Sequence, residues 1–382
     1  MKNNTPKLRF KDFTDEWQEK KLGDLLTLNL REIDKPINPY LAIGIRSHFK
    51  GTFQKPYSDP SKIDMDKLFI VRTGDLVVNI TFAWEGAVAI VKNEDDGGLV
   101  SHRFPTYGFQ KDSCVGHFFR YLYPTEHFKY DLGLASPGGA GRNRVLSKKD
   151  FLKIKLTVPH IEEQEKIADF LTSVDEKINL LEEKKKGFLK YKKGVMQAIF
   201  SQKIRFKDEK GNIFPDWEEK KLGEIVFVTL PPTKLQSKEF NSFGKYPIID
   251  QSQDFIAGYT DDRFNLVPKG EYIIFGDHTE CIKFADFEFA QGADGIKILQ
   301  VIEDGIVTKY LYYAFSTSYN QELNYKRHWS TAKDTIIQLP SREEQEKIAE
   351  FLTSLDNKVD LINKGLGQAK LFKKSLLQQM FV

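Results

Sequence analysis

The chain has little of what marks secreted, cysteine-rich or membrane-spanning proteins. Its only cysteines, Cys114 and Cys281, lie far apart, so a disulfide framework or a cysteine metal site is not expected and a reducing compartment fits. The first residues, MKNNTPKLRFKDF, lack the apolar stretch of a signal peptide. No run approaches the ~18 apolar residues that a membrane-spanning helix needs. We therefore expect a cytoplasmic protein.

The sequence also lacks a strong charge imbalance and a recognisable catalytic motif. The net charge is +3 over 382 residues, which permits a nucleic-acid partner without arguing for one. There is no Walker A sequence and no G-x-G-x-x-G opening a βαβ unit. His48, His102 and His117 do not have metal-ligand spacing. We predict binding surfaces, no catalytic residue, no metal site and no cofactor bound by this chain.

What the chain does have is a long internal repeat. EEQEKIADFLTSVDEKINLL begins at Glu162 and EEQEKIAEFLTSLDNKVDLI at Glu343, a shift of 343 − 162 = 181 positions, and 18 of the 40 aligned positions are identical. Upstream, KLRFKD at Lys7 returns as KIRFKD at Lys203, and WQEKKLGD at Trp17 returns as WEEKKLGE at Trp217. The chain thus reads as two tandem units with similar ends and dissimilar middles.

Both copies of the repeat have the heptad pattern of a coiled-coil helix. The apolar positions start with Ile167, Leu171, Val174 and Ile178 in the first copy and with Ile348, Leu352, Leu355 and Val359 in the second. Lys185 and Lys192 interrupt the first seam, and Lys373 interrupts the second. Neither copy contains proline, and each opens with two glutamates, which suit the positive end of a helix dipole.

An amphipathic helix of about 40 residues needs a partner along its apolar face. The simplest partner of each copy is the other. We favour an antiparallel pair with pseudo-two-fold symmetry, because the chain then leaves and re-enters the pair at the same end. The seams around Leu171–Leu181 and Leu352–Ile362 are expected to pack on each other. A parallel pair, or two helices each packed on its own domain, remains the alternative.

The segments between the repeats are rich in β-forming residues. LFIVRTGDLVVNITF begins at Leu68 and EYIIFGDHTECIKFADFEFA at Glu271, and glycine, aspartate and asparagine punctuate such runs. VRTGDLVV at Val71 matches VPKGEYII at Val267 in pattern. We predict an α/β (α+β) protein in which two β-rich domains of one fold are each followed by a long helix. Divergent loops on a shared scaffold usually carry specificity.

Basic and amide side chains gather in these loops. Arginine, asparagine, glutamine and histidine can contact base edges, and lysine and arginine can hold phosphates. Each cluster alone could equally be a solvated loop. The candidate DNA-binding residues are Arg46, His48, Lys50, His102, Arg103, Arg142, Asn143 and Arg144 in the first middle, and Gln251, Gln253, His278, Gln291, Lys326, Arg327 and His328 in the second.

The order of these motifs resembles the specificity subunit of type I restriction–modification systems. The segment LSKKDFLKIKLTVPHIEEQEKIADFL at Leu146, closing a variable domain, carries the resemblance, although its second copy begins less typically, with STAKDTIIQLP at Ser330. The resemblance implies target-recognition domains over 1–158 and 203–339 and conserved spacer helices over 159–202 and 340–382. It implies that the helices dock methyltransferase subunits and that each domain reads one half of a bipartite double-stranded DNA target.

The same resemblance implies two methyltransferase subunits and restriction subunits as partners, with S-adenosylmethionine, ATP and Mg²⁺ bound by those partners. The chain itself is then a non-catalytic subunit. Two other classes stay open: a self-sufficient methyltransferase or nuclease with an unrecognised site, and a coiled-coil adaptor that binds only proteins. Activity without partners would favour the first, and failure to bind DNA beside a methyltransferase would favour the second.

Overall fold

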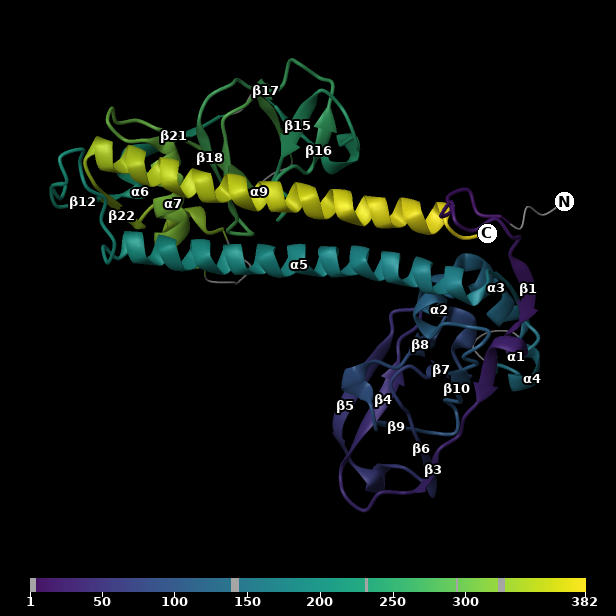
Figure 1. The fold of residues 1–382 in the computed structure, drawn as a ribbon. Helices are drawn as coiled ribbons and strands as arrows, with labels where there is room; N and C mark the ends of the chain where they lie inside the picture. The colour runs from purple at the N-terminus through teal and green to yellow at the C-terminus, as the bar shows by residue number, and fades with distance from the viewer. Residues whose placement is uncertain (1–4, 139–143, 231–232, 293–294, 322–326) are drawn as a thin grey trace. The chain divides into compact units, whose positions relative to one another are not determined.

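The chain folds into two compact units that share both long helices. The computed structural model describes residues 5–138, 144–230, 233–292, 295–321 and 327–382 (Figure 1). The first unit contains Met1–Leu180 and Leu366–Val382, and the second unit contains Leu181–Gly365. Each long helix therefore contributes one part to each unit.

The described part of the first unit contains three sheets. A two-stranded sheet pairs β1 with β11, a four-stranded sheet has the order β2-β10-β7-β8, and a five-stranded sheet has the order β3-β6-β9-β4-β5. The strands are β1 (Gln18–Lys21), β2 (Leu26–Leu28), β3 (Glu32–Asp34), β4 (Tyr40–Ile45), β5 (Thr52–Ser58), β6 (Lys67–Ile70), β7 (Leu76–Val78), β8 (Val88–Ile90), β9 (Leu99–Val100), β10 (Thr106–Phe109) and β11 (Lys155–Val158).

The second unit repeats this plan in its described residues. β12 pairs with β22, the order β13-β21-β18-β19 matches the first four-stranded sheet, and the other sheet has the order β14-β20-β15-β16 with β17 also on β20. The strands are β12 (Glu218–Lys221), β13 (Val226–Thr229), β14 (Lys234–Leu235), β15 (Tyr246–Ile249), β16 (Gly258–Thr260), β17 (Leu266–Val267), β18 (Tyr272–Gly276), β19 (Ile282–Ala285), β20 (Phe289–Gly292), β21 (Ile296–Val301) and β22 (Ile336–Leu339).

Shorter helices connect these strands. They are α1 (Leu22–Leu25), α2 (Gly116–Leu122), α3 (Glu126–Leu134) and α4 (Lys148–Phe151) in the first unit and α6 (Leu222–Ile225), α7 (Thr308–Ser318) and α8 (Trp329–Ala332) in the second. Single 3₁₀ turns lie at Pro60–Lys62, Ala83–Glu85, Asn93–Asp95 and Ser237–Glu239. No helix in the described part of the chain combines the length and apolar composition that a membrane span requires.

Each four-stranded sheet is buried on both faces. The side chains of its strands alternate between the two faces and therefore enter two different cores. In the first unit, Leu76 and Val78 of β7 pack in one core with α2 and the start of the first long helix, whereas Val77 packs with strands of the five-stranded sheet. In the second unit, Ile273 and Phe275 of β18 pack in the core that contains α7 and the long helices. Ile274, between them, packs in the core with the other sheet. In each unit, the four-stranded sheet therefore lies between helices on one face and the other sheet on its second face.

The long helices are α5 (Ile161–Phe200) and α9 (Arg342–Gln379). In the first unit, the start of α5 shares a core with the end of α9, and this core includes Ile167, Leu171, Val174, Ile178, Leu376 and Met380. In the second unit, the end of α5 shares a core with the start of α9, and this core includes Ile199, Ile348, Leu352 and Leu355. In both units the start of one helix meets the end of the other, so the predicted antiparallel pairing is confirmed.

All eight predicted spacer-helix residues are buried, Val359 among them. The predicted contact between the Leu171–Leu181 and Leu352–Ile362 seams is wrong in its register, however. Leu171 lies in the first unit and Leu352 in the second. Two antiparallel helices of similar length place equivalent early positions at opposite ends of the pair, so these two segments cannot face each other. The pseudo-two-fold symmetry concerns the placement of the units and stays a prediction.

The repeated EEQ sequence anchors the start of each long helix. Gln164 Oε1 accepts a hydrogen bond from the backbone N–H of Val115 at 3.0 Å, and Gln345 Oε1 accepts one from Val307 at 2.9 Å. Each glutamine also donates to the carbonyl of the proline five residues earlier, at 2.9 Å in both units. In each unit, one glutamine thus bonds the long helix to the domain before it. This explains why the glutamine is identical in both copies, which the heptad pattern does not explain.

Candidate nucleic-acid interface

Segments that carry the second-unit candidates converge on the turn after β18, which itself carries His278. The N–H of Asp277 donates to the carbonyl of Gly295 at 2.6 Å, and the N–H of His328 donates to the carbonyl of Asp277 at 2.9 Å. The N–H of His278 donates to Gln251 Oε1 at 3.3 Å. Segments near positions 251, 278, 295 and 328 therefore meet around one turn, although they are far apart in the sequence.

A buried polar pair holds this turn in place. Glu280 and His328 are 2% and 0% exposed, and His328 Nδ1 lies 2.7 Å from Glu280 Oε1. Glu280 has a φ of 56°, a left-handed conformation that is unfavourable for a residue with a side chain. The N–H of Trp329 donates to Asp277 Oδ1 at 2.9 Å, which adds a second link between the same segments. The strained turn is thus fixed by contacts from His328 and from Trp329, the first residue of α8.

This burial changes the status of two candidates. His328 has no accessible surface, and Gln291 of β20 is 2% exposed. A side chain that water does not reach cannot contact DNA unless the fold opens, so both are left out of the interface proposed below. Sequence reasoning placed them on the surface because it treats every polar residue near a turn as exposed. Gln253 and Arg327 are exposed, and Gln251 and His278 are half-buried.

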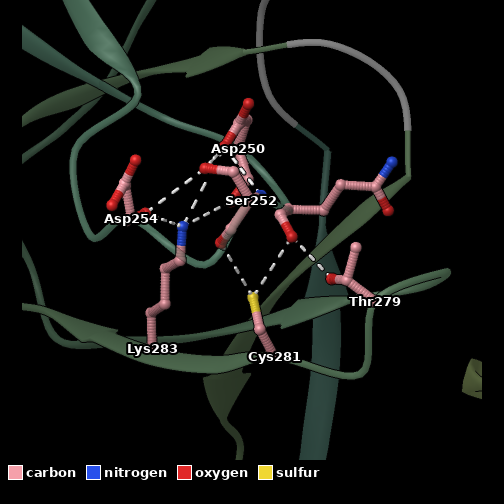
Figure 2. A network of polar contacts seen from close by, with 7 residues as sticks. Asp250, Ser252, Asp254, Thr279, Cys281 and Lys283 are labelled. Carbon is pink, nitrogen blue, oxygen red and sulfur yellow. Dashed lines mark hydrogen bonds and ion pairs between the residues drawn. The ribbon is translucent and has the colours of Figure 1, made fainter. Parts of the chain in front are cut away.

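A buried lysine supports the loop that carries the two glutamines (Figure 2). Lys283 of β19 is 5% exposed, and its Nζ donates to the carbonyls of Asp250 and Asp254 at 2.8 and 2.6 Å. The Oγ1 of Thr279 donates to the carbonyl of Gln251 at 2.6 Å. Burial lowers the pKa of the Lys283 ammonium. The loop turns its carbonyls inward to these donors, and Gln253 stays exposed to solvent.

In the first unit, three predicted clusters converge on the segment after β7, Asn79–Ala87. The N–H of His48 donates to the carbonyl of Glu85 at 2.8 Å. The N–H of Ile80 donates to the carbonyl of Arg103 at 3.0 Å, and the carbonyl of Ile80 accepts from Leu146 at 2.8 Å. Loops 45–51, 101–104 and 144–146 are therefore bound to one segment that the sequence reasoning did not select.

The basic and histidine side chains of these loops are open to solvent. Arg46, His48, Lys50, His102, Arg103 and Arg144 are all exposed. The guanidinium of Arg144 lies 5.6 Å from the ring centre of Trp84, and both residues line one open cleft with Tyr130 of α3. A cation on an aromatic face keeps its charge while the ring restricts its position. Trp84 was missed because a single tryptophan in a loop has no motif around it.

The two convergence points occupy the same place in the fold. β7 and β18 are third in sheets of matching order, and each pairs antiparallel with the strand after the turn. The matched runs at Val71 and Val267 lead into these strands. The match between the two runs could therefore have located both sites, because each site follows its run directly in the sequence. We name the two sites the β7 loop cluster and the β18 loop cluster.

Three candidates, Arg142, Asn143 and Lys326, lie outside the described residues. Among the residues that the structure does describe, no group of three or more histidine, cysteine, aspartate or glutamate side chains is placed to hold a metal ion. Asp277 and Glu280 of the β18 loop cluster are buried, whereas the exposed candidates of both clusters are arginine, lysine, histidine and glutamine side chains. Such groups suit recognition of phosphates and base edges.

Comparison with known proteins gives consistent matches. A specificity subunit of the type I restriction enzyme EcoR124I/EcoR124II from Escherichia coli is 29% identical over 133 residues, which is 33% of each chain. The MjaVIII specificity subunit from Methanocaldococcus jannaschii is 25% identical over 297 residues, 67% of this chain and 68% of that one. The chain thus aligns with only a third of the length of the first relative.

Solved structures support the fold. A type I restriction–modification S subunit from M. genitalium has a TM-score of 0.63 at 17% identity, covering 99% of both chains. A chain from a study of the assembly and conformational transition of a type I system has a TM-score of 0.54 at 16% identity, covering 95% of this chain and 96% of that one. The family model for the type I restriction modification DNA specificity domain matches residues 14–190 and 215–370. The resemblance is thereby confirmed, and the chain belongs to the type I restriction modification DNA specificity family.

Proposed function

We propose that the chain is a non-catalytic specificity subunit in which each unit reads one half of a bipartite double-stranded DNA target. The observation that carries this is the convergence of polar loops on equivalent turns, the β7 and β18 loop clusters. Two copies of one scaffold with different loops can read two different half-sites. A single continuous target would not require the duplication.

Within each cluster the side chains divide between two roles. The exposed cations of the β7 loop cluster, such as Lys50 and Arg103, suit phosphate contacts that position the domain. Arg144 on Trp84 and Gln253 on its supported loop suit base contacts, because arginine and glutamine can pair bidentately with guanine and adenine. A side chain held as Arg144 is on Trp84 loses less conformational entropy on binding, which favours it for base reading.

The long helices suit the docking of one methyltransferase subunit per copy. Leu180 and Leu361 are equivalent positions with exposures of 64% and 71%, and Tyr191 and Phe372 are equivalent positions with exposures of 55% and 52%. Large apolar side chains exposed at equivalent sites of both copies are expected for two identical partners. S-adenosylmethionine, ATP and Mg²⁺ are proposed to bind the methyltransferase and restriction subunits.

A domain exchange tests this function. Residues 25–146 are replaced by the equivalent stretch of a related subunit, and the variant is assembled with its methyltransferase. Methylation mapping of host DNA should show one half-site changed and the other half-site and the gap unchanged. Alteration of both half-sites would contradict the division of labour. The exchange of residues 225–330 is the matched control and should change only the other half-site.

Two further assays separate the rival functions. The purified chain alone, incubated with DNA, S-adenosylmethionine and Mg²⁺, should neither methylate nor cleave. Turnover without a partner would instead identify a self-sufficient enzyme. Absence of DNA binding in the methyltransferase complex would identify a protein-only adaptor.

A further inference from the structure

Two lysines interrupt the apolar seam at equivalent positions, Lys192 in α5 and Lys373 in α9, with 373 − 192 = 181. In the second unit, Lys192 Nζ forms an ion pair with Asp356 of α9. In the first unit, Lys373 Nζ lies 2.5 Å from Asp175 Oδ1 of α5. Each lysine therefore pairs with an aspartate of the other helix, and the two aspartates are also equivalent positions.

A tyrosine from the domain completes each cluster. Tyr121 of α2 donates from its hydroxyl to Asp175 Oδ2 at 2.9 Å, and Tyr313 of α7 donates to Asp356 Oδ2 at 2.6 Å. The lysine Nζ lies 5.5 Å from the ring centre of Tyr121 in the first unit and 5.3 Å from that of Tyr313 in the second. Burial raises the pKa of Tyr121 to about 12 and raises that of Tyr313 as well, so both phenols keep their protons.

These Lys–Asp–Tyr triads restrict how the helices can pair. Apart from these lysines and Lys185 the seam is apolar, and apolar contacts alone do not exclude a slip of one helix by a heptad. A slip in either direction would separate each lysine from its aspartate, and in one direction it would place Lys192 against Ala349 and Lys373 against Ala168. The lysines are only 17% and 28% exposed, so an unpaired charge there would be unfavourable. Single polar positions in apolar seams are known to fix register.

We propose that the two triads set the register of α5 against α9 and thereby the gap between the DNA half-sites. The statement about the gap rests on the proposed function, whereas the statement about register does not. A slip of one heptad moves one helix by ~10 Å along the other. At ~3.4 Å per base pair this corresponds to about three base pairs. The triads are thus determinants of target spacing, distinct from the loops that read bases.

The test removes the charges and keeps the seam apolar. The triad variant carries Lys192→Leu, Lys373→Leu, Asp175→Asn and Asp356→Asn. The matched control carries Lys193→Gln, Lys374→Gln, Asp169→Asn and Asp360→Asn, which change the same charges at exposed positions of the same helices. Spin labels at Glu176 and Gln378, both exposed in the first unit, report the distance between the helices in full-length chains that carry Cys281→Ser.

The unaltered chain and the control should give one distance. The triad variant should give additional distances shifted by ~10 Å, with a melting temperature that is unchanged or higher, because filling the seam removes a lysine from it. A single unshifted distance in the triad variant overturns the proposal. A merely structural ion pair would lower the melting temperature without adding distances.

A second variant covers the case in which the triad variant does not fold. Lys192→Asp alone should broaden the distance, and addition of Asp356→Lys should restore the single distance, because the reversed pair meets only in the native register. Failure of this rescue also overturns the proposal. Methylation mapping then separates the two statements. Slipped helices with an unchanged gap would refute the link to DNA spacing, while the assignment of the register would stand.

Discussion

The two units are alike where they meet the long helices and unlike where their loops lie. Their four-stranded sheets have the same strand order, and the glutamines at the starts of α5 and α9 accept equivalent hydrogen bonds. In contrast, β3 pairs antiparallel with β6, whereas β14 pairs parallel with β20. Helix α3 lines the cleft beside Trp84, and the described residues of the second unit between α7 and α8 contain no corresponding helix.

This difference shows which contacts the residues identical in both copies of the repeat make. The identical positions include Gln164, Asp175 and Lys192, whose equivalents are Gln345, Asp356 and Lys373. Each of them bonds the long helix either to its domain or to the other helix. The loop clusters share no such identity but are built on equivalent strands. The repeat therefore preserves the contacts that hold the long helices, and the loop clusters are free to differ.

The largest expected effect comes from breaking one unit's helix packing. Leu171 is 0% exposed, so Leu171→Asp should destabilise the first unit by several kcal/mol through a buried, unpaired carboxylate. Hydrogen exchange should show loss of protection in residues 366–379 and retained protection in 342–365. The control, Leu180→Asp at a position that is 64% exposed, should change stability by less than ~0.5 kcal/mol. Uniform loss along all of α9 would show that the units do not stand independently.

A smaller effect should distinguish the two helix starts. Arg9 donates twice to Glu163, at 2.7 Å each, and Arg205 donates twice to Glu344, at 2.9 Å each. Glu344 also accepts from Trp217 Nε1 at 2.9 Å, whereas Trp17 Nε1 has no hydrogen-bond partner among the described residues.

Arg9→Met should therefore cost about 3–5 kcal/mol, because Glu163 is 1% exposed and loses its cation. Arg205→Met should cost less, about 1–3 kcal/mol, since one charge-assisted bond remains. Exchange protection at the starts of α5 and α9 measures both losses. Addition of Trp217→Phe to Arg205→Met should remove the difference, and equal costs for the two single arginine variants would contradict the account.

How much the sequence predicted follows from the same comparison. Heptad spacing identified the helices and the buried positions such as Leu171 and Val359, because helix periodicity depends on local sequence. It did not predict the register, which depends on pairs such as Lys373 with Asp175 that are distant in the chain. The loops were found from their composition, but their convergence and the burial of His328 result from tertiary contacts that composition does not contain.

Loop substitutions should test the proposed division of DNA contacts between the two loop clusters. Arg144→Ala should relax the first half-site at one position, at a cost of about 1–3 kcal/mol, and leave the second unchanged. Arg327→Ala should affect only the second half-site. Lys50→Ala, as a phosphate contact, should weaken binding to all sequences and reduce its salt dependence. Titration of the methyltransferase complex with half-site variants measures these effects. Unchanged affinity in all three variants would show that DNA binds a different surface.

The smallest expected effect is a pH dependence confined to the β18 loop cluster. Lys283 has a folded-state pKa below its ordinary value of 10.5 because it is buried. The carboxylates of Asp250 and Asp254 and the thiol of Cys281 act in the opposite direction, but burial is the larger influence. Between the folded pKa and 10.5 the unfolded chain binds more protons than the folded one, so raising the pH through this window stabilises the fold.

Lys283→Met removes this titration while retaining an apolar stem of similar length. The stability of the unaltered chain minus that of Lys283→Met should therefore increase as pH rises toward 10.5, because titrating groups that do not interact with Lys283 cancel in the difference. Thermal unfolding at a series of pH values measures it. Among the described residues, the first unit has no counterpart of this lysine beneath its β7 loop cluster. A stability difference that falls as pH rises would mean that the ammonium is better solvated in the fold than its 5% exposure implies.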